Sequence, residues 1–293
     1  MNVFKSFFCI GLALAASLTA NAEVQILLEE NFDSGAVKQP GLGIGSQNGG
    51  IVGISTDPKE VLGNKGGSLR AVYPKGGTGG IYGWASFDMR PYKTYEVYVE
   101  FHAKMPKAKQ GIKFLKIFGG ANTTFGLDYT GIALGKGTLY QVSFGDGTTP
   151  VNDTQNVINL NGANPSWIGR SYGKAIVKTP ENMAFYAAQW GDKWHHFRFK
   201  IKFNSAIKNA DGSYTEINDG EYLVQIDGRT YVDAKGLLNR HPTNEPITKI
   251  AFLDWSQNIT EEFEIWYDNI RITLGGFYTG NDPSADQMFP KYQ

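Results

Sequence analysis

The chain has 293 residues but a single cysteine, Cys9, which lies in a segment that we expect to be removed. Residues 1–22 combine one lysine, an apolar run and the small-residue sequence Ala-Asn-Ala, which is the pattern of a secretory signal peptide. The mature chain would therefore be exported and yet carry no disulfide bond. A chain of this length can bury enough apolar surface to fold without one. We expect a secreted or periplasmic protein.

The sequence also lacks an excess of charge of either sign. It holds 28 basic and 28 acidic side chains, and loss of the leader with its one lysine leaves 27 and 28, a net charge of −1. Without a basic field, nucleic acid is not an expected partner. No later apolar run is long enough for a membrane-spanning helix, so we expect no membrane span in the mature chain. We further expect it to be a monomer.

Several motifs with known chemistry are missing as well. There is no His-Glu-x-x-His zinc motif, no EF-hand loop and no Gly-x-Ser-x-Gly nucleophile elbow. A retaining glycosidase needs two carboxyls about 5 Å apart, and no tight E-x-D-x-E strand supplies them. Glu262 and Glu264 have a suitable spacing, but we expect both to face solvent. A glycoside hydrolase is therefore a minor alternative, and no cofactor is required.

What the sequence does have is alternation of apolar and polar residues. In residues 194–204 the phenylalanines share one face of a predicted strand, whereas His196, Arg198 and Lys200 share the other. Residues 94–105 alternate in the same way and place Tyr98 on their polar face. Strands with rows of such side chains can line a site for an anionic polymer.

Many alternating segments without crossover helices predict an all-β fold, with two antiparallel sheets stacked as a jelly-roll sandwich. The 36 glycines are typical of a domain with many turns. We expect the sandwich over residues 23–275 and an irregular tail over 276–293. Glycine-rich residues 41–50 predict a loop. Weaker strands are predicted at 125–134, 138–144 and 184–190, and a long surface excursion at 145–180.

A structural calcium site is a further candidate. If the first and last predicted strands pair, Glu30 and Asp268 approach each other, and Ca²⁺ prefers carboxylate oxygens. We take these two residues as candidate ligands of a structural Ca²⁺.

Large aromatic side chains lie at predicted strand ends or in loops, namely Trp84, Trp167, Trp190 and Trp255. Sugar rings stack on such faces. The same side chains could instead plug the ends of the sandwich, and the sequence leaves both interpretations open.

Cleavage of a uronic acid polymer by β-elimination would give the polar residues a role. The reaction needs a cation or amide that neutralises the C6 carboxylate, a base that removes the C5 proton, and an acid that protonates the leaving oxygen. Residues of these types lie on the polar faces of predicted strands or nearby: Tyr98, His102, Lys116, Tyr129, Gln189, His196, Arg198 and Lys200.

Six runs of sequence together resemble the concanavalin A-like jelly-roll polysaccharide lyases of the heparinase I and glucuronan lyase type. The resemblance covers most of the mature chain, but its motifs are mostly structural. Non-catalytic glycan-binding domains share the same strand pattern. The runs are ENFDSG at 30–35, GGSLRAVYPKGGTGGIYGW at 66–84, YEVYVEFHAKMPKAKQGIKFLKIFG at 95–119, WHHFRFKIKFN at 194–204, DGEYLVQIDGR at 219–229 and WYDNIRI at 266–272.

The resemblance implies roles for six residues: Lys116 and Arg198 as carboxylate binders, His102 or His196 as the base, and Tyr98 or Tyr129 as the acid. We also expect Lys200, Gln189 and Trp190 to bind substrate. The sequence thus predicts a secreted polysaccharide lyase-like protein whose partner is an acidic polysaccharide. The alternative is a non-catalytic glycan-binding or surface-structural module of the same fold.

Overall fold

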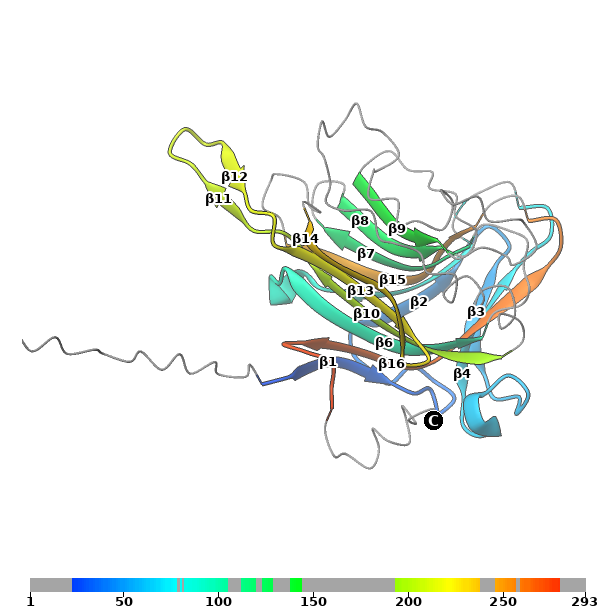
Figure 1. Ribbon diagram of the computed structural model, residues 1–293. Helices are drawn as coiled ribbons and strands as arrows, with labels where there is room; N and C mark the ends of the chain where they lie inside the picture. The colour runs from blue at the N-terminus through cyan, green and yellow to red at the C-terminus, as the bar shows by residue number, and fades with distance from the viewer. Residues whose placement is uncertain are drawn as a thin grey trace, which may run out of the picture.

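Two β-sheets packed face to face form the body of the protein (Figure 1). The structure is a computed structural model, and it describes residues 23–77, 80, 82–104, 112–119, 123–128, 138–143, 193–237, 246–256 and 259–279. The two sheets confirm the predicted all-β sandwich. Within these residues, no helix is both long and apolar enough to cross a membrane.

The larger sheet has eight strands. Its order is β14-β13-β10-β6-β16-β4-β3, and β1 pairs with the second half of β16. The first and last strands thus pair, which is the condition for the calcium site predicted at Glu30 and Asp268. The strands are β1 (Gln25–Glu30), β3 (Ile51–Ser55), β4 (Ser68–Tyr73), β6 (Glu96–Lys104), β10 (Trp194–Lys202), β13 (Gly220–Ile226), β14 (Arg229–Leu237) and β16 (Phe263–Leu274).

The smaller sheet has six strands in the order β2-β5-β15-β7-β8-β9. All neighbours in it are antiparallel except β8 and β9, which run parallel. A two-stranded hairpin, β11 with β12, projects from the sandwich (Figure 1). The remaining elements are β2 (Leu42–Ser46), β5 (Gly83–Asp88), β7 (Ile112–Gly119), β8 (Thr123–Asp128), β9 (Thr138–Ser143), β11 (Ala206–Lys208), β12 (Tyr214–Glu216), β15 (Ile247–Ser256) and the 3₁₀ helices η1 (Leu62–Asn64) and η2 (Arg90–Tyr92).

The hydrophobic core lies between the two sheets. Along β10, burial alternates with every residue, as the sequence predicts. Phe101 of β6 stacks on Phe197 of β10 with ring centroids 5.0 Å apart, and it meets Phe252 of β15 edge-on at 5.5 Å. Burial of one phenylalanine contributes about 1.5–3 kcal/mol, so contacts of this kind hold the two sheets together.

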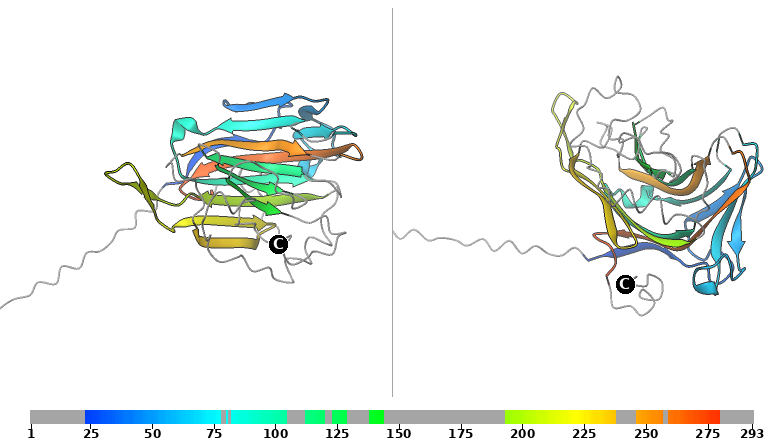
Figure 2. Two further views of the ribbon diagram at one scale, coloured as in Figure 1. Left: turned by 90° about the horizontal axis from the view of Figure 1, so that it is seen from above. Right: turned by 45° about the vertical axis from the view of Figure 1, so that its right-hand side comes forward.

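Both sheets curve in the same sense. Figure 2 shows the eight-stranded sheet bending around the six-stranded sheet. The outer face of the six-stranded sheet is therefore concave; this concave face carries Trp84, Ser86, Lys116, Phe118 and Lys249, whose chain neighbours are core residues. The outer face of the eight-stranded sheet is the convex face; it carries Tyr98, Glu100, His102, His196, Arg198 and Lys200.

One strand forms where the sequence predicts a loop. Strand β2 contains Gly43 and Gly45 and pairs along its length with β5. The ring of Trp84 lies over both glycines, and a β-carbon on either would press against it. The loop prediction is wrong here because packing against a neighbouring strand overrides the low strand propensity of glycine.

Other boundaries agree more closely. The segment predicted at 138–144 forms β9 at residues 138–143. The segment predicted at 125–134 overlaps β8 at residues 123–128, and its later residues lie outside the described part of the chain. Strand β16 ends at Leu274, and Gly275 and Gly276 then turn the chain with positive φ angles. Three predicted segments lie outside the described residues: the signal peptide at 1–22, the excursion at 145–180 and the strand at 184–190.

Candidate functional site

The basic and aromatic residues predicted on β6 and β10 do share one face, the convex face. Antiparallel pairing sets them directly opposite one another: His196 with His102, Arg198 with Glu100, and Lys200 with Tyr98. Their availability to a ligand depends on the bonds that each already makes.

Four side chains form a row of alternating charge across β1, β16, β6 and β10: Glu29, Arg271, Glu100 and Arg198. Glu29 accepts a hydrogen bond from Arg271, and Arg198 Nε lies 2.6 Å from Oε1 of Glu100. Burial raises the pKa of Glu100, and the charges of Arg198 and Arg271 act in the opposite direction. Cross-strand pairs of opposite charge stabilise a sheet, and this row neutralises itself.

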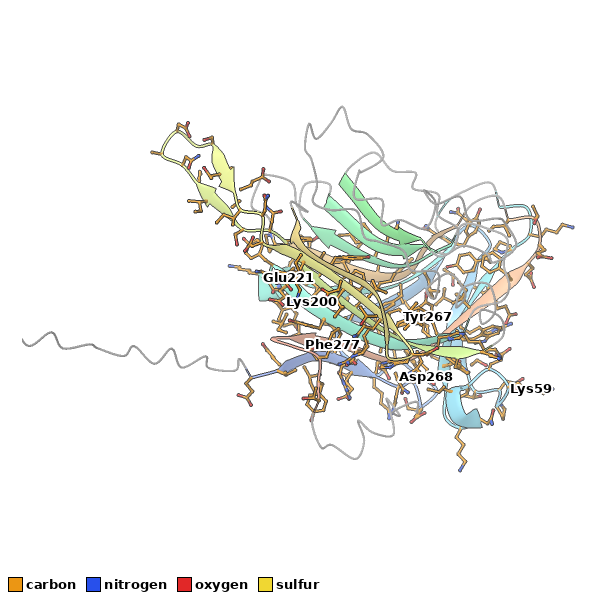
Figure 3. All side chains as sticks on the ribbon, viewed as in Figure 1. Lys59, Lys200, Glu221, Tyr267, Asp268 and Phe277 are labelled. Atoms are coloured by element: carbon orange, nitrogen blue, oxygen red, sulfur yellow. The ribbon has the colours of Figure 1, made fainter. Side chains whose placement is uncertain are left out.

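Lys200 and Tyr98 belong to a second set of paired groups. Lys200 Nζ lies 2.5 Å from Glu221 and 3.2 Å from Glu96, and Figure 3 shows Lys200 beside Glu221. Burial lowers the pKa of Lys200, but its bonds to the two carboxylates raise it overall. The Tyr98 hydroxyl donates to Glu96 at 2.5 Å, and burial together with this bond raises the pKa of Tyr98 to about 12.

The two histidines of the convex face stack on each other, with ring centroids 4.9 Å apart and 22° between planes. His102 is fully buried, and burial followed by the charge of His196 lowers its pKa well below the usual value. Burial followed by the charge of Arg198 lowers the pKa of His196 to about 4. Both imidazoles are therefore neutral at neutral pH. His195, on the opposite face of β10, is buried with Nδ1 2.8 Å from Asp227.

The segment after β16 covers this row of charges. The Arg198 guanidinium lies 4.0 Å from the ring centroid of Phe277, and that of Arg271 lies 4.8 Å from the ring of Tyr278. Phe277 also meets Tyr98 edge-on at 4.9 Å. The convex face is thus a self-paired network under an aromatic cover rather than a surface that presents its cations to a polymer.

The two predicted calcium ligands lie in environments that the structure describes, and, after burial, the charge of Glu30 contributes to the raised pKa of Asp268. Glu30 already accepts three backbone N–H bonds, from Phe32, Lys38 and Gln39 at 2.6–3.0 Å. Burial, with smaller effects from the nearby carboxylates, raises the pKa of Asp268 to about 8. Over the described part of the chain, no group of three or more His, Cys, Asp or Glu side chains is arranged to hold a metal ion. A calcium ion at Glu30 and Asp268 stays a prediction.

Lys116 lies on the other sheet, on the concave face. Its Nζ is 5.7 Å from the ring centroid of Phe118, and Lys249 of the neighbouring strand β15 places its Nζ 4.1 Å from the same centroid. All three side chains are half-buried. Two ammonium groups therefore flank one aromatic ring on the inside of the curve.

The structure separates Lys116 from the other predicted residues. The hydrophobic core lies between Lys116 and the convex face that holds Arg198 and His196. Lys116 and Arg198 therefore do not bind one carboxylate together, and neither histidine reaches a sugar held at Lys116. The sequence could not exclude this arrangement, because it does not tell which sheet each strand joins.

Further side chains extend the concave face toward its β2 edge. Trp84 and Ser86 point outward from β5, since Ala85 and Phe87 between and beside them are buried. At the end of β5, Arg90 forms an exposed ion pair with Asp88 at 2.8 Å. Exposed pairs of this kind contribute little to stability.

Sequence reasoning missed Lys249 and Phe118. Both lie in segments whose alternation is visible, since Lys249 precedes the core residue Ile250 and Phe118 follows the core residue Ile117. Only the pairing of β15 with β7 brings them together. Three other predicted site residues, Tyr129, Gln189 and Trp190, lie outside the described residues.

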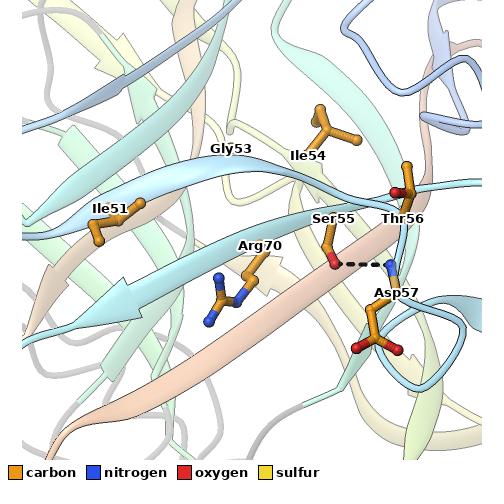
Figure 4. A pocket seen from close by; sticks show the side chains of 7 residues that line it. All are labelled: Ile51, Gly53, Ile54, Ser55, Thr56, Asp57 and Arg70. Atoms are coloured by element: carbon orange, nitrogen blue, oxygen red, sulfur yellow. Dashed lines mark hydrogen bonds between the residues drawn. The ribbon is translucent and has the colours of Figure 1, made fainter.

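A hollow of about 430 Å³ lies elsewhere, at strands β3 and β4 (Figure 4). Its one basic side chain, Arg70, is held by Glu264 and lies 3.7 Å from Glu60. Ser55 Oγ accepts from the backbone of Asp57 at 3.3 Å. Because its cation is already neutralised, this hollow does not suit an anionic ligand.

No protein-family model and no curated protein matches this chain. Among solved structures, the cellulose-induced protein Cip1 is 15% identical with a TM-score of 0.49, over 84% of this chain and 96% of that one. An endo-β-1,4-glucuronan lyase from the fungus Trichoderma reesei is 13% identical with a TM-score of 0.49, over 85% and 95%. An alginate lyase from Chlorella virus is 12% identical with a TM-score of 0.47, over 85% and 99%. These jelly-roll neighbours are similar in fold, and at such identities the likeness does not extend to residue roles.

Proposed function

We propose that this chain is an exported, polysaccharide lyase-like protein that binds a uronate-containing glycan across its concave face and cleaves it by β-elimination. One observation carries the proposal: Lys116 and Lys249 flank the ring of Phe118 on the inside of the curved sheet. A uronate residue offers a carboxylate for the ammonium groups and an apolar ring face for the aromatic side chain.

The lysines supply the first requirement of the reaction. An ammonium group at the C6 carboxylate stabilises the negative charge that develops when the C5 proton leaves. The C5–H and C4–O bonds then break, a C4–C5 double bond forms, the base keeps the proton and an acid protonates the leaving oxygen. The enclosed positions of His102 and His196 favour tyrosine in these two roles, and Tyr129 is the acid candidate that remains.

The second candidate function is a non-catalytic glycan-binding module. The burial of His102 and His196 on the convex face favours it, because neither histidine can serve as a base at the concave face. Such a module would use the same two lysines and the same aromatic ring.

Incubation of the mature protein with a panel of uronic acid polymers separates the two functions. The lyase proposal predicts ultraviolet absorbance from the unsaturated product with at least one polymer, and at least tenfold slower formation in Lys116→Ala. Lys208→Ala removes an equal charge from an exposed strand of the hairpin and should retain full activity. Binding without any product would favour the non-catalytic module, and neither binding nor product would overturn both.

A further inference from the structure

Trp84 occupies an unusual position at the β2 edge of the concave face. Its neighbour Ala85 is fully buried, so the Trp84 side chain points outward. In the sheet it stands opposite Gly45 of strand β2. About 37% of the residue is exposed, whereas the aromatic residues of the core are almost fully covered.

Two glycines make room for the indole ring. A β-carbon on Gly45 would lie 2.5 Å from two ring carbons of Trp84, and one on Gly43 would lie 3.1 Å from a third. The ring therefore follows β2 and rests on backbone that carries no side chains. Its other side is left for solvent or a ligand.

The two glycines lower the stability of β2. A tryptophan that only closed the end of the sandwich would not require them. Glycine inside a strand weakens it relative to alanine, and β2 carries two glycines beneath one ring. An indole that only filled space would be covered by its neighbours. Here the glycines instead hold it as an exposed platform.

We propose that Trp84 forms a sugar-stacking subsite at the β2 edge of the concave face, which binds a pyranose residue through its apolar C–H face. The inference rests on the proposed function, since both use one glycan on one face. The indole supplies an apolar surface for ring stacking. It needs no charge, so the stacked residue can be neutral or acidic.

The position of the Trp84 ring sets a minimum ligand length. Trp84 belongs to β5, but its ring lies over Gly43 and Gly45 of β2. Strands β5 and β15 separate β2 from β7, and adjacent strands lie about 4.8 Å apart, so the ring is roughly 14 Å from the strand that carries Lys116 and Phe118. A single sugar cannot contact both. The ligand is an oligosaccharide that crosses several strands.

Calorimetric titration with uronate oligosaccharides of increasing length tests the subsite. We expect Trp84→Ala to weaken binding about tenfold for long oligosaccharides and not at all for a disaccharide held at the lysines, and Trp84→Phe to recover part of the loss. Gly45→Ala keeps the tryptophan but displaces its ring, so it should weaken binding of long oligosaccharides as well. Gly53→Ala is the matched control, because a β-carbon there meets no atom within 4 Å.

The outcomes separate this inference from the proposed function. Unchanged affinity of Trp84→Ala for long oligosaccharides, together with loss of binding in Lys116→Ala, would overturn the subsite and leave the proposed function standing. An equal loss for short and long oligosaccharides would also overturn it. If Gly45→Ala does not fold, the two Trp84 variants still decide the question.

Discussion

Lys249 holds its ammonium group 4.1 Å from the ring centroid of Phe118, across the pairing of strands β15 and β7. Among the described residues, no carboxylate forms an ion pair with Lys249, in contrast to Lys200 and Arg198 on the convex face. The position of Lys249 is therefore set by an aromatic ring, which leaves its charge available to an anionic ligand.

The first prediction concerns Phe118. Its replacement by alanine should weaken binding of a uronate polymer about three- to fivefold, because each half-buried cation–π contact contributes about 0.5–1 kcal/mol to the placement of a lysine. Phe118→Tyr keeps the ring and should bind as the wild type does. Calorimetric titration measures both. Wild-type affinity in Phe118→Ala would show that the ring does not position the lysines.

A second prediction concerns the cover of the convex face. Phe277→Ala should lower the free energy of unfolding by about 1–2 kcal/mol, because it removes a half-buried ring and its contact with Arg198. Thr279→Ala, two residues further on, should change it by less than about 0.5 kcal/mol. Urea denaturation gives both values. An equal, small effect for the two variants would contradict the role of Phe277 as a cover.

The third prediction is a dependence of stability on pH. His196 has a pKa of about 4 in the folded chain and about 6.5 when unfolded. Between these values the unfolded state binds a proton that the folded state does not, so the histidine contribution to stability is full above pH 6.5 and is lost as the pH falls toward 4. The loss is on the order of 3 kcal/mol.

His196→Gln isolates that contribution. Glu100 and Asp268 have raised pKa values and change stability with pH in the opposite sense, so the wild-type curve alone is not decisive. The difference in unfolding free energy between wild type and variant should shrink from pH 7 to pH 5. A constant difference would mean that His196 titrates alike in the folded and unfolded chains.

The fourth prediction tests the calcium site. If Ca²⁺ binds at Glu30 and Asp268, its addition should raise the melting temperature and a chelator should reverse the change, since a ligand at 100 times its Kd stabilises by about 2.7 kcal/mol. Asp268→Asn should abolish the response. A melting temperature that is the same with Ca²⁺ and with chelator would contradict a structural Ca²⁺ at Glu30 and Asp268.

The core could be predicted from sequence because burial follows a period of two. The alternation in residues 194–204 fixes which side of β10 faces inward, and the structure agrees at every position. The pairing of β1 with β16 was only a condition for the predicted calcium site, and the structure supplies it. The alternation is a local property of the sequence, so it can be recognised without knowing which strands are neighbours.

The site could not be predicted in the same way, because it depends on partners distant in sequence. From the sequence alone, Arg198 is predicted to be an available cation. In the structure it pairs with Glu100, which Arg271 also neutralises, and the ring of Phe277 covers its guanidinium. Lys249 gains its significance only through Phe118, on a strand more than a hundred residues earlier. Strand β2 was not predicted because glycine has a low strand propensity. The reason for its glycines, which is the room they leave for the Trp84 ring, is visible only in the structure.

The most direct test of the account is the affinity of the double variant Lys116→Ala/Lys249→Ala for a uronate polymer, measured against wild type and Lys208→Ala at equal ionic strength. We expect a loss of about a hundredfold or more in the double variant, since a hydrogen bond to a charged group contributes about 1.5–3 kcal/mol for each lysine. We expect no change in Lys208→Ala. Wild-type affinity in the double variant would contradict the concave face as the binding site.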